Sequence, residues 1–247
     1  MSRARRLRAE VVAEGRSFLR RRTAVFFTFL FPVILVLIFG ALVGTSSSAG
    51  LFAEPPAYYV PGYLAVVVLF TPLSRVSSTV ARHREGRRFE KLATTPLSAA
   101  EWLAAHAVVN VGLVFAAGAL VLGLVALLTD ARFTLSPLLV PFVALGTTVF
   151  VGAGALIGRL SDSQDGAIAA SNAIGLPLLF LSETFVPPSL LPAWFRPVTA
   201  LSPLTYFARG TRDAVTAGTG WAPELAVLAV LALAALGIGA WAVPWRT

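Results

Sequence analysis

Long apolar stretches separated by short polar segments dominate the hydrophobic pattern of this chain. A helix needs about 20 apolar residues to cross the roughly 30 Å hydrocarbon core of a bilayer, and six stretches approach or exceed that length. The pattern therefore predicts an all-α, polytopic membrane protein with six transmembrane helices. The predicted spans cover about residues 24–43, 59–80, 103–128, 137–160, 166–181 and 223–243.

The segment before the first span has a different pattern, because arginines surround a narrow apolar stripe. Leu7, Val11 and Phe18 recur at spacings of four and seven, which place them on one side of a helix. Such a helix lies in the headgroup layer, with its arginines on anionic lipid. A topology signal with no further role is an equally good interpretation. We expect an amphipathic interface helix over 1–23 and a transmembrane domain over 24–247.

The charged stretch between the second and third spans predicts a short helix followed by a sharp break. Phe89 and Leu92 share a helical face that is surrounded by charges. Pro96 disfavours helix at the preceding residue, and Ser98 and Glu101 have the capping-box spacing that starts the next helix. A short charged helix with an apolar patch suits docking into a groove of a cytoplasmic partner. A solvated loop whose charges only enforce topology is the alternative.

Composition excludes a soluble enzyme and a disordered chain. Hydrophobic residues make up 57% of the 247 positions and charged residues only 13%, against roughly 25% charged residues in a soluble domain. The net charge of +8 would suggest nucleic acid in a soluble protein. Here 14 of the 20 basic residues lie before the first span or in the stretch from Arg75 at the end of the second span to Lys91 before the third. The positive-inside rule produces that distribution, so we expect both termini in the cytoplasm and no nucleic-acid partner.

The residues that carry chemistry in enzymes are nearly absent from the expected spans. The only lysine, Lys91, follows Glu90, so no phosphate-binding loop of the Gly-Lys-Ser/Thr type exists. The two histidines are too far apart in sequence to form a helical metal pair, and the chain has no cysteine. We therefore expect no catalytic residue, no metal site and no cofactor bound by this chain.

The charged stretch resembles the cytoplasmic motif of type-2 ATP-binding-cassette (ABC) exporter permeases. That motif reads approximately R-E-x-G-T-L-E-x-L-x-x-T-P-L-S, and here Arg87-Arg88 replaces its extra residue and threonine. The resemblance implies a coupling helix that contacts a separate ATPase subunit, which uses ATP and Mg²⁺. The residues expected to couple to the ATPase are Arg84, Glu85, Gly86, Phe89, Glu90, Leu92, Thr94, Thr95 and Pro96.

A second resemblance lies between the fifth and sixth spans. Residues 185–206 look like the family signature F-x-P-x-x-x-x-P-x-W…N-P-L-T-Y, with Ser202 where asparagine is common. The match is nearest to the drug-exporting branch, similar to daunorubicin-resistance permeases. It implies two short re-entrant helices that close the outer end of a pathway; an interfacial loop anchored by aromatic side chains is the alternative. The residues expected in this outer gate are Glu183, Phe185, Pro187, Pro192, Trp194, Pro203 and Tyr206.

Glu183 is the one acidic residue placed beside a long apolar run, and an ionisable group near membrane depth indicates function by default. A charge wetted at the membrane edge explains it equally well. Three polar residues within spans, Asn110, Ser171 and Asn172, either line a pathway or form hydrogen bonds between helices.

These expectations combine into one functional hypothesis with two alternatives. The chain is expected to be the permease subunit of an ABC exporter, paired as a homodimer in a bacterial cell membrane and moving an amphiphilic, drug-like substrate outward. Frequent alanine and arginine suggest a bacterial source. The alternatives are a permease for polysaccharides or lipid-linked glycans, and a membrane assembly or sensor subunit that transports nothing.

Overall fold

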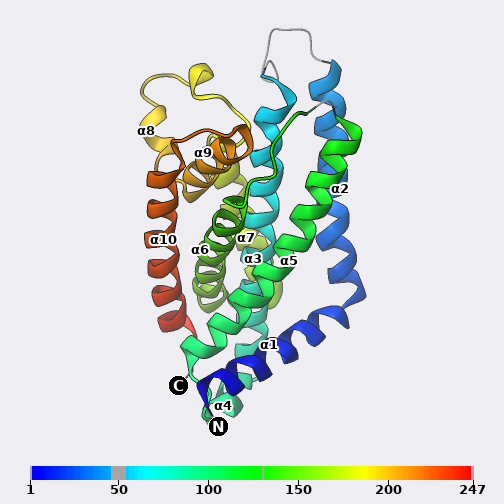
Figure 1. The fold of residues 1–247 in the computed structure, drawn as a ribbon. Coiled ribbons are helices and arrows are strands. Elements are labelled where there is room, and N and C mark those ends of the chain that lie inside the picture. Colours follow the sequence, from blue (N-terminus) through cyan, green and yellow to red (C-terminus); the bar gives the residue numbers. More distant parts are fainter. Residues whose placement is uncertain (1, 46–53, 130, 246–247) are drawn as a thin grey trace.

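The computed structural model describes residues 2–45, 54–129 and 131–245, and every regular element in these ranges is helical. Figure 1 shows these helices arranged as an elongated bundle. The all-α class predicted from the sequence is confirmed. The elements are α1 (Arg3–Leu19), α2 (Arg22–Thr45), η1 (Pro56–Tyr59), α3 (Val60–Glu85), α4 (Arg88–Ala93), α5 (Ala99–Leu128), α6 (Leu139–Leu160), α7 (Gln164–Phe180), η2 (Pro188–Leu190), α8 (Arg196–Thr199), α9 (Pro203–Thr216) and α10 (Trp221–Ala242).

A helix occupies each of the six predicted spans, with ends shifted by a few residues. Within the described residues, α3, α5, α6 and α10 are each long and apolar enough to cross a membrane. Helices α1 and α2 pass the same test only as a pair, and the pair is bent by 81°. Helix α7 has 17 residues, which is the lower limit for a crossing helix. Length and composition therefore show four or five spans.

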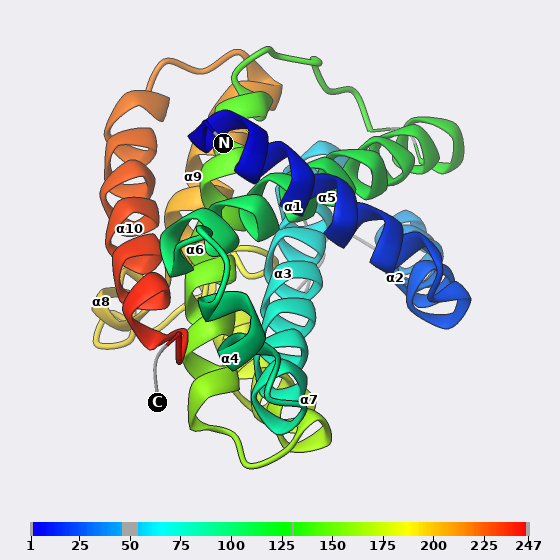
Figure 2. The ribbon, with the colours of Figure 1, turned by 90° about the horizontal axis from the view of Figure 1, so that it is seen from below.

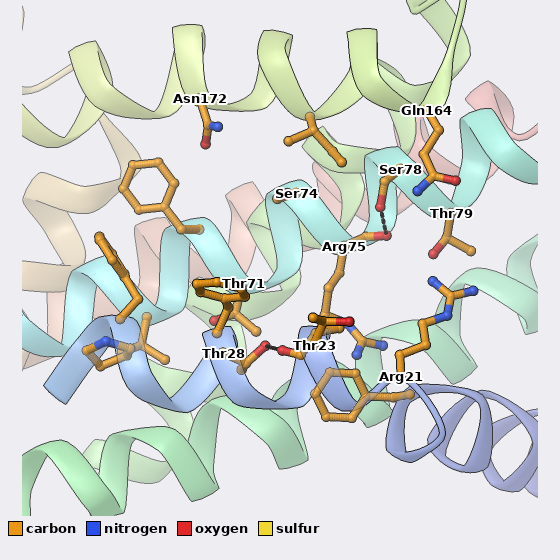
Figure 3. A pocket seen from close by; sticks show the side chains of 18 of the residues that line it. Arg21, Thr23, Thr28, Thr71, Ser74, Arg75, Ser78, Thr79, Gln164 and Asn172 are labelled. Carbon is orange, nitrogen blue, oxygen red and sulfur yellow. Dashed lines mark hydrogen bonds between the residues drawn. The ribbon is translucent and has the colours of Figure 1, made fainter. Parts of the chain in front are cut away.

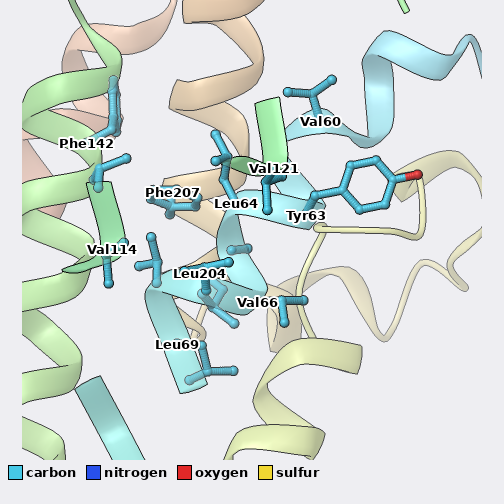
Figure 4. Close-up of a cluster of buried hydrophobic side chains, with 14 of the residues drawn as sticks. Val60, Tyr63, Leu64, Val66, Leu69, Val114, Val121, Phe142, Leu204 and Phe207 are labelled. Atoms are coloured by element: carbon cyan, nitrogen blue, oxygen red, sulfur yellow. The ribbon is translucent and has the colours of Figure 1, made fainter. Parts of the chain in front are cut away.

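Helix α3 forms the centre of the bundle, with α2, α5, α6, α7 and α9 all in contact with it. The first half of α3, which follows η1, is buried on nearly every side because the surrounding helices contribute apolar side chains. Figure 4 shows part of the apolar cluster formed in this way, which includes Leu64 and Leu69 of α3, Val114 of α5, Phe142 of α6 and Phe207 of α9. Helix α10 lies against the other side of α6. This core fixes the positions of both ends of α3.

Local sequence signals explain where the helices begin. Ser98 and Glu101 form the complete capping box at the start of α5, as predicted. The side chain of Ser163 accepts a hydrogen bond from the backbone N–H of Gly166 (3.0 Å) and starts α7 in the same way. These caps satisfy backbone donors that a helix cannot pair internally.

The two ends of the bundle have different contents. Both termini and α4 lie at one end, where α1 crosses beneath α5 (Figures 1 and 2). The segment from η2 to α9 lies at the opposite end (Figure 1). The short charged helix and the proline-rich segment therefore occupy opposite ends of the same bundle.

Candidate functional site

The short helix α4 is attached to the bundle by one buried aromatic side chain. Phe89 is 2% exposed, and its ring lies 5.3 Å from that of Trp102 and 6.0 Å from that of Trp245. Leu92 packs against the same apolar cluster. The opposite side of α4 is exposed and carries charges of both signs. We call Arg87, Arg88, Glu90 and Lys91 the docking face.

Two residues of the family-like motif bind another part of the chain. The guanidinium of Arg84 donates to the backbone carbonyls of Arg159 and Ser161, and Oε1 of Glu85 accepts from the backbone N–H of Gln164 at 2.9 Å. These bonds join the end of α3 to the α6–α7 connection. We call them the α3 clamp. The α3 clamp therefore ties the end of α3 that leads into α4 to the α6–α7 connection.

The remaining predicted coupling residues shape the backbone around α4. Gly86 ends α3, and Arg87 has the left-handed backbone conformation (φ 50°) that turns the chain into α4. The hydroxyls of Thr94 and Thr95 donate to the carbonyls of Lys91 (2.8 Å) and Leu92 (2.6 Å) at the end of α4. Both threonines and the following Pro96 are exposed. The motif thus builds a compact helix between two turns.

Helix α1 is held on the bundle by ion pairs with α3 and α5. Arg6 pairs with Glu101 at 2.5 Å, and Glu14 pairs with Arg75 at 2.8 Å. Burial raises the pKa of the Glu14 carboxyl, while Arg75 and Arg21 oppose that rise. The apolar stripe predicted for this segment ends in Phe18, which is buried beneath the guanidinium of Arg75 (4.3 Å to the ring centroid). A helix therefore occupies most of the N-terminal segment and packs on the bundle.

A cavity of about 1070 Å³ lies between α1, α2, α3 and α7. Its end nearest α1 is polar, with Arg21 and Arg75 both directed into the space in Figure 3. Aromatic and aliphatic side chains of α2, α3 and α7 line the rest, among them Phe31 and Phe70. The cavity is slightly larger than the 300–1,000 Å³ typical of small-molecule sites.

The three polar residues predicted for spans differ in their surroundings. Asn172 lies on the cavity wall (Figure 3). Ser171 is buried and shares a hydrogen bond with Ser77 of α3 (2.7 Å). Asn110 donates to the carbonyl of His106 one turn earlier (2.8 Å), also in a buried position. The structure therefore brings only Asn172 to the cavity.

At the opposite end, Glu183 is buried and bound on several sides. Its carboxylate pairs with Arg209 of α9 at 2.5 Å and accepts from the hydroxyl of Thr199 at 3.1 Å. This ion pair raises the pKa of Arg209. Arg212, one turn further along α9, donates to the carbonyl of Glu183 (2.9 Å) and covers the ring of Tyr58 (3.9 Å). We call this group the outer ion-pair cluster.

The other residues expected in the outer gate divide into packed and exposed positions. Phe185 packs against Tyr63 of α3, with ring centroids 6.2 Å apart, and Pro187 is also buried. Trp194 is 75% exposed. The remaining members are exposed Pro192, Pro203 at the first position of α9, and half-buried Tyr206.

Sequence reasoning missed three arginines that organise these sites. Arg75 lies within a predicted span, where an ionisable residue is itself a signal of function, but it was counted only as a charge that sets topology. Arg209 and Arg212 are spaced by three, which places them on one face of α9. That spacing was the available signal for partners of Glu183.

Comparison with known proteins agrees with this arrangement. A family model described as ABC-2 type transporter matches residues 6–216. The match runs from α1 to the end of α9 and so includes the docking face, the cavity and the outer ion-pair cluster. A search of individually curated proteins finds no match. Among the described residues, no three side chains of His, Cys, Asp or Glu gather as a metal site.

Proposed function

The chain belongs to the ABC-2 type transporter family, and we propose that it is the membrane-spanning permease subunit of an ABC exporter. It moves an amphiphilic, drug-like substrate outward, and a separate ATPase subunit supplies the energy from ATP and Mg²⁺. The single observation that carries this proposal is the geometry of α4. That helix presents an exposed charged docking face, and its buried Phe89 attaches it to the bundle. The α3 clamp joins the preceding helix to the α6–α7 connection.

The proposed topology places six spans in a bacterial cell membrane with both termini in the cytoplasm. Helices α2, α3, α5, α6, α7 and α10 cross the bilayer, and α1 lies in the headgroup layer. The distribution of arginines supports this orientation, because the positive-inside rule assigns the N-terminal segment and the α4 region to the cytoplasm. The segment from η2 to α9 then folds back at the outer surface and closes the pathway.

The proposed coupling route begins at the docking face. Closure of two ATPase subunits on ATP displaces α4, whose buried Phe89 transmits the force to Trp102 of α5. The α3 clamp transmits it to the α6–α7 connection. The cavity beside α7 then changes its shape and its affinity for the substrate. Transport results when these alternating states differ in the side of the membrane to which the cavity is exposed and in their affinity for the substrate.

The active unit is proposed to be a homodimer joined along α7. Ala169 and Ala173 are exposed four residues apart on that helix, and small residues at this spacing let two membrane helices approach closely. The motif around residues 185–206 supports the drug-exporting branch, similar to daunorubicin-resistance permeases.

The test is co-purification of the tagged chain with candidate ABC ATPase subunits, followed by ATP turnover in lipid vesicles. We expect one ATPase subunit to bind and to hydrolyse ATP faster in the complex than alone. Glu90→Arg, which reverses one charge on the exposed docking face, is expected to lower co-purification at least fivefold. Glu54→Arg, at the opposite end of the bundle, is the matched control. ATP hydrolysis by the purified chain alone, or failure to bind any ATPase subunit, contradicts the proposal.

A further inference from the structure

The cavity between α1, α2, α3 and α7 has an uneven distribution of charge. Four arginines and one glutamate line its polar end, which leaves a net charge of +3 (four minus one). Glu14 already pairs with Arg75. In the part of the chain that the structure describes, no salt bridge joins Arg20, Arg21 or Arg22 to a carboxylate. Three guanidinium groups therefore surround this end without an acidic partner.

The rest of the cavity is apolar and extends away from the arginines along the helices. Phe27 and Phe31 on α2 face Val67 and Phe70 on α3, and Leu176 of α7 lines the third side. The rings of Phe31 and Phe70 meet edge to face, with centroids 6.4 Å apart. Phe27 is 60% exposed and Phe31 49%. A chain of methylene groups gains free energy by covering such surface.

Charges that only set topology lie where water and lipid headgroups can reach them, and Arg16 is exposed on α1. Arg75 is different, because its side chain is only 16% exposed and its guanidinium lies against the ring of Phe18 on α1. Arg21 is half-buried at the joint between α1 and α2, and its charge acts on both Glu14 and Arg75. A guanidinium group in a partly dehydrated position favours a bidentate oxyanion partner such as a phosphate or a carboxylate.

We propose that this cavity binds an anionic amphiphile whose phosphate-type headgroup lies at Arg20, Arg21 and Arg22 and whose hydrocarbon tail lies between α2, α3 and α7. This inference rests on the proposed function, since it names the substrate class that the exporter carries. The substrate enters with its headgroup at the level of the arginines and its tail in the bilayer. A cationic amphiphile of the same length is excluded by the net positive charge.

The absence of cysteine from the sequence allows a single introduced thiol to report occupancy. Ser78 lines the polar end of the cavity (Figure 3). The full-length Ser78→Cys variant in phosphatidylcholine nanodiscs is labelled with a maleimide while hexadecyl phosphate is added. We expect labelling to slow at least fivefold, whereas hexadecyltrimethylammonium leaves it unchanged. Ala93→Cys, exposed on α4 outside the cavity, is the control for surface effects.

The role of the arginines is tested in the Ser78→Cys background. Arg21→Gln is expected to raise the concentration of hexadecyl phosphate for half-protection about tenfold, the range for one lost charge-assisted hydrogen bond. Arg16→Gln makes the same charge change outside the cavity and is expected to change the half-protection concentration less than twofold. Equal effects of the two variants, or equal protection by the cationic amphiphile, overturn the anion site.

A second experiment distinguishes a transported substrate from a lipid that only resides in the cavity. It also distinguishes both of these from failure of the proposed function. In the complex with its ATPase subunit, hexadecyl phosphate is expected to stimulate ATP turnover at least twofold. The Arg21→Gln variant is expected to require a higher concentration of hexadecyl phosphate for the same stimulation. Protection of Ser78→Cys without stimulation identifies a resident lipid and overturns the substrate assignment. A complex that hydrolyses no ATP contradicts the exporter itself, while the labelling arm still decides whether the cavity binds an anion.

Discussion

Gly152 shows how a single missing side chain sets the distance between two helices. A Cβ atom at this position overlaps the backbone carbonyl of Ala235 on α10, whereas one at Gly237 meets nothing within 4 Å. Gly152→Ala is therefore expected to lower the free energy of unfolding by about 1–3 kcal/mol, as overpacked positions do. Gly237→Ala is expected to be neutral or to stabilise α10 by up to about 1 kcal/mol. Thermal unfolding in detergent measures both, and equal effects contradict the close contact.

The outer ion-pair cluster provides a second residue-scale prediction. Arg209→Ala leaves the buried carboxylate of Glu183 without its strongest partner. Breaking a buried pair costs about 3–5 kcal/mol, but the Arg209 side chain is 41% exposed, so solvent reduces the expected loss to about 1–3 kcal/mol. The control is Arg196→Ala in the same segment, an exposed position. A thermal midpoint that falls equally in both variants contradicts the cluster.

The same residues show the limit of sequence reasoning at this scale. Its position beside an apolar run made Glu183 a candidate functional residue, but its partner lies 26 residues away in a segment interrupted by prolines. Arg84 and Glu85 were predicted as coupling residues from the motif, and their partners are backbone groups 75 to 79 residues away. Such pairs depend on the three-dimensional arrangement of helices, which hydrophobic periodicity does not specify.

At the scale of elements, the attachment of α1 to α5 depends on one carboxylate with two roles. Glu101 completes the capping box of α5 and also pairs with Arg6 of α1. Glu101→Gln is expected to weaken the ion pair and to speed amide hydrogen exchange throughout α1. Ser98→Ala removes only the cap, at a cost of about 1 kcal/mol, and is expected to leave exchange in α1 unchanged. Hydrogen exchange in nanodiscs measures both variants. If the amides of α1 stay protected in Glu101→Gln, another contact attaches α1 to the bundle.

Elements were the scale at which the sequence predicted most. Apolar runs of about 20 residues place helices reliably, because the bilayer allows few other structures, and the capping box placed the start of α5. The 81° bend between α1 and α2 was not predicted. Gly154 and Gly158 have the spacing of four that lets two membrane helices approach closely, but that spacing does not identify the partner helix. The structure places both against the backbone of α3, at Leu73 and Ser77.

For the whole molecule, the α3 clamp predicts that one variant loses binding of the ATPase subunit and another loses only the coupling of substrate to ATP turnover. Glu85→Ala removes the bond to the N-terminus of α7 but leaves the docking face intact. We expect this variant to co-purify with the ATPase subunit as the parent chain does, while substrate-stimulated ATP turnover falls at least threefold. Glu90→Arg is expected to lose co-purification itself. Loss of binding in Glu85→Ala means that Glu85 contacts the ATPase subunit directly.

The proposed homodimer makes the last prediction, because one face of α7 suits contact with a second helix. Helix α7 exposes Ala169 and Ala173 four residues apart, and small residues at this spacing let a second membrane helix pack closely. The cysteine-free chain allows a single Ala173→Cys to test this by oxidation in native membranes. We expect a disulfide-linked dimer from Ala173→Cys and none from Leu233→Cys, which is 72% exposed on α10. A dimer formed only through Leu233→Cys moves the interface to α10 and contradicts contact along α7.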